Sequence, residues 1–315
     1  MAGPGDALFA KFNAERAEAV AKKDGSLMDK IQRELLLRIQ ERTGRKLAAY
    51  VANPLNEGSN LDHNDKGFFV SLLDGVDKNA KELDVIVYSP GGYPEAVEAI
   101  VRMLRRRFND IRFIVPHYAK SAATMLVLSG NSIVMKDTAE LGPIDPQVRS
   151  RLMSGPAQAI LEGWDELREE IGRDGKLNPA YLPILEKLDI ALLKACRSAN
   201  KYGESMVRAW LKQYMFKGDP GAAWKSQKAV KYFSTHKRHL THGRPLFIEE
   251  VRKKAGLPII PLESLGEELA KMIWEYHYRF EFLFLNSRGL AKIYHSEGAY
   301  MVYFYGNLLV ENTTQ

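Results

Sequence analysis

The stretch Leu83-Asp-Val-Ile-Val-Tyr-Ser-Pro-Gly-Gly-Tyr93 decides the fold. Its first six residues are mostly β-branched or apolar and predict a buried strand over 83–88. From 94 to 108 the apolar side chains return every three or four residues with arginines between them, which predicts an amphipathic helix. A buried strand that leads through a turn into such a helix is the unit from which mostly parallel α/β sheets are built.

The same unit recurs on both sides of this stretch. Further strands are expected over 47–52, 111–115 and 132–135, and further helices over 66–76 and 121–129. Short apolar runs that alternate with amphipathic helices indicate βαβ crossovers. The sequence therefore predicts a wound α/β core of repeated strand and helix units.

The two ends of the chain predict additions to that core. Residues 1–45 are expected to form a helical N-terminal segment, and 261–315 a C-terminal extension with an aromatic-rich helix and a nearly uncharged strand. The main domain is expected over 46–260. Within it, 150–180 is rich in turn signals, and two helices separated near Gly203 are expected after it.

Length and composition limit the classes of protein to consider. The 315 residues are 45% hydrophobic and 27% charged, which excludes a wholly disordered or collagen-like chain. The formal net charge is +6, but the basic runs lack interleaved aromatic residues, so no nucleic-acid role is expected. The single cysteine, Cys196, excludes an intrachain disulfide and a cysteine-based zinc site. Without an apolar run of about 18 residues, the chain is expected to be cytoplasmic.

Two loops of the predicted core carry side chains that suggest chemistry. Gly91 and Gly92 follow a strand, and adjacent glycines let backbone N–H groups face a developing anion. Ser121 opens the helix after the next strand. A serine at that place is ordinarily an N-cap, which stabilises a helix by about 0.5–2 kcal/mol. If the two strands are neighbours, however, the Ser121 hydroxyl faces the glycine turn.

Three motifs, in this order and spacing, resemble a known family. They are Ser-Pro-Gly-Gly at 89–92, Ala-Lys-Ser-Ala-Ala at 119–123 and Leu-Gly-Pro-Ile-Asp-Pro-Gln at 141–147. Together they resemble the serine dehydrogenase proteinase family, a relative of the Clp protease proteolytic subunit and of signal peptide peptidase A. The resemblance continues more weakly through Thr-His-Gly-Arg-Pro at 241–245, so it extends over more than half of the chain.

The resemblance implies a peptidase of the Clp protease and crotonase fold. It matches Ser121 to the nucleophile, and Gly91 and Gly92 to the glycines of the oxyanion hole. The order of the family's triad is serine, aspartate, histidine, which maps onto Ser121, Asp145 and His242. The Clp subunit has its histidine near the position of Asp145 and its aspartate near that of His242.

The chemistry of histidine favours the same assignment, because a pKa near 6.5 suits proton transfer at neutral pH. We therefore expect a serine endopeptidase that works through an acyl-enzyme. Ser121 attacks the peptide carbonyl, His242 takes its proton and Asp145 orients His242. Amides of the glycine pair and of Ala122 are expected to hold the oxyanion.

Three alternatives stay open. In a dyad of the signal peptide peptidase type, a lysine that burial keeps neutral replaces the histidine, and Lys136 or Lys176 is then the base. A crotonase-like enzyme acting on a coenzyme A thioester uses the same oxyanion device and does not require Ser121. A catalytically inactive scaffold could bind a membrane or a peptide partner through the aromatic tail.

Metals, cofactors and partners complete the expectations. His236, His239 and His242 recur every third residue, but no His-Glu-x-x-His helix accompanies them. No metal and no cofactor is therefore expected, and two of these histidines are assigned to a solvated basic loop. The expected substrate is a peptide or protein. Spare apolar stripes in the terminal helices favour a homo-oligomer, and a peripheral membrane or membrane-protein partner is a further option.

Overall fold

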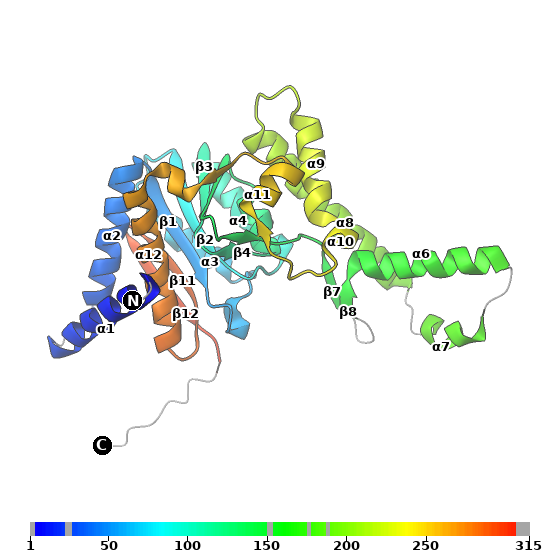
Figure 1. Cartoon of the computed structure of the whole chain (residues 1–315), viewed down its shortest axis with the longest axis horizontal. Helices are drawn as coiled ribbons and strands as arrows, with labels where there is room; N and C mark the ends of the chain where they lie inside the picture. Colours follow the sequence, from blue (N-terminus) through cyan, green and yellow to red (C-terminus); the bar gives the residue numbers. More distant parts are fainter. Residues whose placement is uncertain (1–3, 23–26, 150–153, 175–177, 187–189, 307–315) are drawn as a thin grey trace, which may run out of the picture.

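A twisted central sheet organises the molecule (Figure 1). The computed structural model describes residues 4–22, 27–149, 154–174, 178–186 and 190–306. In spatial order the strands are β10 (Ile259–Pro261), β5 (Ser132–Met135), β3 (Asp110–Val115), β2 (Glu82–Tyr88), β1 (Lys46–Ala52), β11 (Leu290–Ser296) and β12 (Ala299–Phe304). The strands from β10 to β1 are parallel, whereas β11 and β12 are antiparallel to their neighbours. The protein is thus a mixed α/β fold with a mostly parallel sheet.

One face of the sheet is covered by the helices that connect its parallel strands. These are α3 (Asp65–Asp74), α4 (Pro94–Arg107) and α5 (Ala122–Val127). Each connection moves one strand further in the same direction, from β1 to β2, β3 and then β5. Because such crossovers share one hand, their helices lie on the same face. Fully buried side chains such as Tyr50, Val85 and Phe113 fill the space between sheet and helices.

The opposite face is covered by helices from the two ends of the chain. They are α2 (Leu27–Thr43) and α12 (Glu267–Asn286), with α1 (Pro4–Ala21) packed beside them (Figure 1). Leu36 and Ile39 of α2 meet Ile273 and Tyr276 of α12 in a second buried cluster. A sheet buried on both faces explains why its parallel strands are nearly continuous apolar runs.

A smaller sheet lies beside the carboxyl ends of the main strands. It contains β4 (Tyr118–Ala119), β6 (Glu140–Leu141) and β9 (Leu246–Phe247), in that order. The remaining segments are the hairpin β7 (Gln147–Arg149) and β8 (Ser154–Pro156), and the helices α6 (Ala157–Asp174), α7 (Leu182–Leu185), α8 (Ile190–Trp210), α9 (Ala222–Ser234), α10 (His236–His239) and α11 (Ile248–Glu250). In Figure 1, α6 and α7 project away from the central sheet.

The structure differs from the sequence-based expectations in three elements. A single helix, α8, runs through Gly203, where two helices were expected. A Cβ on Gly203 would lie 3.5 Å from Met125 Cε, an ordinary contact distance, so Gly203 lies inside α8 facing α5 and does not end a helix. Helix α6 occupies a region rich in turn signals, and β11 adds an antiparallel strand that no local pattern indicated. None of the described helices is both long enough and apolar enough to cross a bilayer.

Candidate active site

Ser121 lies at the junction between β4 and helix α5. It is half-buried, with φ 51° and ψ −124°, a backbone conformation that residues with a Cβ rarely adopt. Among the described residues other than glycine, only Leu240 shares a positive φ. The Ser121 side chain makes no capping hydrogen bond to α5. The ordinary N-cap role therefore does not account for this serine.

The glycine turn after β2 packs directly against Ser121. β2 and β3 are neighbours, and a bridge between Ser89 and Ala119 continues their pairing into the two loops. A Cβ placed on Gly91 would lie 2.8 Å from Ser121 Cβ and 3.1 Å from the backbone nitrogen of Ala122. Gly91 also has φ +111°, which disfavours other residues. A glycine is therefore needed at position 91 for this close approach.

Two backbone amides at this junction lack a hydrogen-bond partner. The N–H groups of Gly92 and Ala122 donate to no other described residue. Gly91 differs from the expectation, because its N–H donates to Ser89 Oγ at 3.2 Å. The turn is held in place by Leu61, whose N–H donates to Gly91 O at 2.7 Å. Free N–H groups beside a serine hydroxyl are the donors that an oxyanion hole requires.

The small sheet brings Asp145 and His242 to the same end as Ser121. Strands β4 and β6 are parallel, whereas β9 is antiparallel to β6. The chain after β4, the chain after β6 and the chain before β9 therefore emerge together. These three segments contain Ser121, Asp145 and His242, respectively. Gly142 marks the contact, since a Cβ on Gly142 would lie 3.2 Å from Ser121 N.

Asp145 is buried and interacts with three polar side chains. His242 Nδ1 lies 2.8 Å from Asp145 Oδ1, and His236 Nδ1 lies 3.3 Å from Oδ2. Gln147 Nε2 donates to the same Oδ2 at 3.0 Å. The Asp145 side chain is 1% exposed and that of His242 is 27% exposed. A proton on Nδ1 of His242 would leave a lone pair on Nε2, which is the arrangement of a general base.

No hydrogen bond between the described side chains joins His242 to Ser121. Gly142 contacts the Ser121 backbone, and Asp145 lies three residues further along the chain. The chain from Gly142 to Asp145 spans at most about 10 Å, which limits the distance between Asp145 and Ser121. Bonds between a catalytic base and its nucleophile are often long without substrate and tighten when substrate binds. The structure thus pairs Asp145 with His242 and Gly91 with Ser121, and the two pairs share one end of the small sheet.

His236 and His239 are not the solvated loop residues that the sequence suggested. His236 contacts Asp145, and its side chain is 17% exposed. His239 is buried, and its Nε2 lies 2.6 Å from Tyr232 O. Burial lowers the pKa of His239. The short helix α10 turns both imidazoles inward, because a spacing of three residues places them on one side of a helix.

The lysine alternative Lys136 lies on the other face of the sheet. Lys136 follows β5, and its ammonium forms an ion pair with Asp137 at 2.7 Å. The same ammonium is 5.4 Å from the ring centre of Trp274 in α12, on the sheet face opposite α5. None of the ion pairs and hydrogen bonds of the described residues joins Lys136 to Ser121. Lys176 lies outside the described residues.

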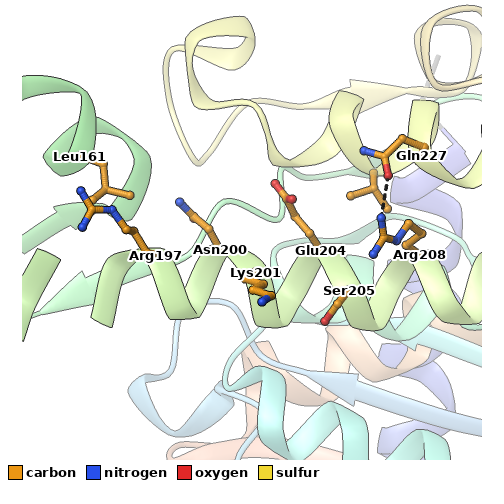
Figure 2. A pocket seen from close by; sticks show the side chains of 9 residues that line it. Leu161, Arg197, Asn200, Lys201, Glu204, Ser205, Arg208 and Gln227 are labelled. Atoms are coloured by element: carbon orange, nitrogen blue, oxygen red, sulfur yellow. Dashed lines mark hydrogen bonds between the residues drawn. The ribbon is translucent and has the colours of Figure 1, made fainter. Parts of the chain in front are cut away.

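A separate pocket of about 330 Å³ lies along α8 (Figure 2). Its lining is mostly polar, and the charged members are Arg197, Lys201, Glu204 and Arg208. Arg208 Nη1 donates to Gln227 Oε1 at 3.1 Å across the pocket wall. Ser121, Asp145 and His242 do not line this pocket, so it is distinct from the serine site.

Comparisons with known proteins give short or distant matches. Two uncharacterized proteins of Methanocaldococcus jannaschii are similar in part: MJ0137 is 41% identical over 86 residues, and MJ1495 is 28% identical over 130 residues. The match to MJ0137 covers 27% of this chain and 29% of MJ0137. The match to MJ1495 covers 40% of this chain and 41% of MJ1495. The chain therefore spans less than half the length of each relative.

A solved structure and a family also match. The structure is of the 1510-N membrane-bound stomatin-specific protease, with 14% identity and a TM-score of 0.36 over 64% of this chain and 74% of that one. Residues 75–178 match the sequence model of a family described as ClpP-like SDH-type serine proteinase. The matched segment contains the glycine turn, Ser121 and Asp145. Over this segment, the chain is similar to the family of ClpP-like SDH-type serine proteinases.

Proposed function

We propose that the protein is a serine endopeptidase that hydrolyses peptide bonds through an acyl-enzyme on Ser121. One observation carries the proposal: the strained Ser121 backbone packs against Gly91 of the glycine turn, and the N–H groups of the next residues, Gly92 and Ala122, have no hydrogen-bond partner among the described residues. Nucleophile and oxyanion donors then come from adjacent loops at the carboxyl ends of β2 and β3. Open α/β sheets build their sites at these ends.

In the acylation step, Ser121 Oγ forms a bond to the scissile carbonyl carbon, and its proton passes to His242 Nε2. The carbonyl oxygen becomes an oxyanion that accepts hydrogen bonds from Gly92 and Ala122. Asp145 holds His242 by the 2.8 Å contact to Nδ1 and stabilises the imidazolium. The C–N bond then breaks, and the leaving amine takes the proton from His242.

In the deacylation step, a water molecule attacks the ester carbonyl on Ser121. His242 Nε2 accepts a proton from that water and then returns it to Ser121 Oγ as the ester bond breaks. The products are a carboxylic acid and the free serine. Each step conserves the proton that His242 carries, so no cofactor is needed.

His242 is proposed as the base in preference to Lys136. A lysine base must be neutral, which burial away from opposite charges achieves. The Lys136 ammonium instead lies 2.7 Å from the carboxylate of Asp137, and no described contact joins it to Ser121. The Nδ1 atom of His242 contacts the buried carboxylate of Asp145, which fixes the tautomer. The His242 side chain is 27% exposed, so its Nε2 edge can turn toward a substrate.

Labelling by a serine-directed fluorophosphonate tests the nucleophile. The wild-type protein should be labelled covalently, and the Ser121→Ala variant should lose the label. Ser71→Ala, an exposed serine of α3, serves as the matched control and should keep it. Label that persists in Ser121→Ala, or that is lost equally in Ser71→Ala, would refute the assignment.

The base is tested with the same probe and with peptide hydrolysis. His242→Ala should slow labelling strongly, whereas Lys136→Ala should label at the wild-type rate. The opposite pattern would favour the Ser-Lys dyad. Absence of labelling together with hydrolysis of coenzyme A thioesters would favour the crotonase-like alternative, and absence of both activities would favour the inactive scaffold.

We also propose that the protein forms a homo-oligomer. The projecting α7 and the start of α8 expose apolar side chains, including Leu182 at 47% and Ile190 at 71% (Figure 1). Apolar side chains on a projecting part of a molecule favour contact with another copy. Light scattering should give an assembly at micromolar concentration, and a monomer under these conditions would contradict the proposal.

The substrate is proposed to be a peptide or protein, and the location is proposed to be cytoplasmic, with recruitment to a bilayer by a membrane-protein partner. The described helices include none that could span a membrane, so membrane contact would be peripheral. Cell fractionation should recover the protein in the cytosol, with a membrane-bound share released by a salt wash. Retention in the membrane pellet after that wash would contradict this localisation.

A further inference from the structure

A second cluster of titratable side chains lies on the opposite face of the sheet, beneath α12. It consists of His117, from the loop after β3, and of His277 and Glu281, which are one helical turn apart on α12. One nitrogen or oxygen of each side chain lies within 4.8 Å of the corresponding atoms of the other two. Two imidazoles and a carboxylate form a ligand set that zinc prefers.

The distances within the cluster fit a tetrahedral ion. Glu281 Oε1 lies 3.0 Å from His117 Nδ1 and 3.5 Å from His277 Nε2. With zinc–ligand bonds of about 2.0–2.1 Å, neighbouring ligand atoms of a tetrahedron are about 3.3 Å apart. Both separations are close to that value. All three ligand atoms lie within 4.8 Å of one another, so small side-chain movements would place them around one ion.

His277 supplies the observation that points to a missing ligand. Its side chain is fully buried, and neither Nδ1 nor Nε2 has a hydrogen-bond partner among the described residues. A buried polar group without a hydrogen-bond partner destabilises a fold. A metal ion bound to Nε2 would remove that destabilisation at one of the two nitrogens.

The surroundings hold both imidazoles in place. Tyr88, the last residue of β2, stacks parallel on the His117 ring, with 5.3 Å between ring centres. The same tyrosine contacts the His277 ring edge-on at 4.8 Å. Both rings are thus oriented by one aromatic side chain before any ion binds. The His117 side chain is 42% exposed, which gives an ion and a water ligand access from solvent.

We propose that His117, His277 and Glu281 form a zinc site, with water as the fourth ligand. The contacts of Glu281 with His117 and His277 leave both His277 nitrogens buried without a hydrogen bond, whereas zinc engages all three side chains. Zinc would also tie α12 to the loop that leads from β3 to Ser121, since His117 lies in that loop. The site is separate from Asp145 and His242, and the proposal does not depend on peptidase activity.

The test uses the full chain stripped of metal and titrated with Zn²⁺ alone by calorimetry. We expect one ion per chain, and tetrahedral absorption bands when Co²⁺ replaces zinc. His117→Gln and Glu281→Gln affect partly exposed side chains and should each weaken Zn²⁺ binding at least tenfold. His63→Gln, which changes an exposed histidine outside the cluster, is the matched control and should bind as the wild type does.

Two results would overturn the zinc site. One is the absence of stoichiometric Zn²⁺ binding by the folded wild-type chain. The other is binding that survives His117→Gln and Glu281→Gln but is lost in His242→Gln, which would place the ion at Asp145 instead. Circular dichroism of each variant separates loss of the site from loss of the fold.

Discussion

Replacing Ser121 by glycine should give a more stable protein than replacing it by alanine. At φ 51° and ψ −124°, a residue with a Cβ is strained by about 1–3 kcal/mol, and alanine retains that Cβ. Glycine removes the strain but gives the unfolded chain more conformational freedom, which costs about 0.5–1 kcal/mol. The free energy of unfolding of Ser121→Gly should therefore exceed that of Ser121→Ala by about 1 kcal/mol.

Urea unfolding followed by circular dichroism measures this difference. Both variants lack the hydroxyl, and the hydroxyl makes no capping hydrogen bond, so the comparison isolates the backbone. The midpoint of thermal unfolding should differ by about 2 °C for a chain of this size. The control is Ala123→Gly, inside helix α5, where glycine should instead lower stability by about 1 kcal/mol.

A Ser121→Gly variant no more stable than Ser121→Ala would contradict this prediction. The Ser121 backbone would then be relaxed, and the strained turn that brings the serine beside the glycine pair would be wrong. Equal stability of the two variants would therefore count against the proposed nucleophile as well as against the strain.

Three further predictions concern the glycine turn, the orienting carboxylate and a buried histidine. Gly91→Ala should lower the fluorophosphonate labelling rate at least 100-fold, because the new Cβ would lie 2.8 Å from Ser121 Cβ. Gly163→Ala is the control, since a Cβ there would have open space around it, and it should be labelled at the wild-type rate. Asp145→Asn should reduce peptide hydrolysis by about 10³–10⁴-fold with little change in folding, and an unchanged rate in a kinetic assay would remove Asp145 from the mechanism. Burial lowers the pKa of His295 to about 3. Between pH 6.5 and pH 3, the His295 imidazole therefore takes up a proton in the unfolded chain but not in the folded chain. The free energy of unfolding should therefore fall by about 4–5 kcal/mol as the pH decreases through this window. Urea unfolding of His295→Gln at several pH values should lack this decrease. A pH dependence equal to that of the wild type would contradict the prediction.

Local sequence patterns determined the parallel core well. The strands β1, β2, β3 and β5 and the helices α3, α4 and α5 lie close to their predicted ranges, because strands buried on both faces are continuous apolar runs and crossover helices carry a regular apolar stripe. The glycine turn and Ser121 could also be found from sequence, because the turn follows β2 directly and Ser121 opens the helix after β3. The neighbouring order of β2 and β3 then brings the two loops together.

The same patterns gave wrong secondary-structure predictions where tertiary contacts changed the meaning of a local signal. Gly203 resembles a helix break, yet it lies inside α8 where that helix approaches Met125. The turn residues before 180 concealed α6, and β11 became a strand by pairing with β1, far away in the sequence. Whether a glycine ends a helix or lets another element come close depends on its neighbours in space, and no short window contains them.

The amino-acid sequence by itself thus determined the α/β class, the order of the core elements and the two loops that carry the glycine pair and Ser121. Only the tertiary structure decided which distant side chains meet. It brought His236 as well as His242 to Asp145, and it gathered His117, His277 and Glu281 beneath α12. The physical reason is that secondary structure follows from periodicities of a few residues, whereas these clusters depend on pairing and packing between segments separated by 91 to 164 positions in the chain.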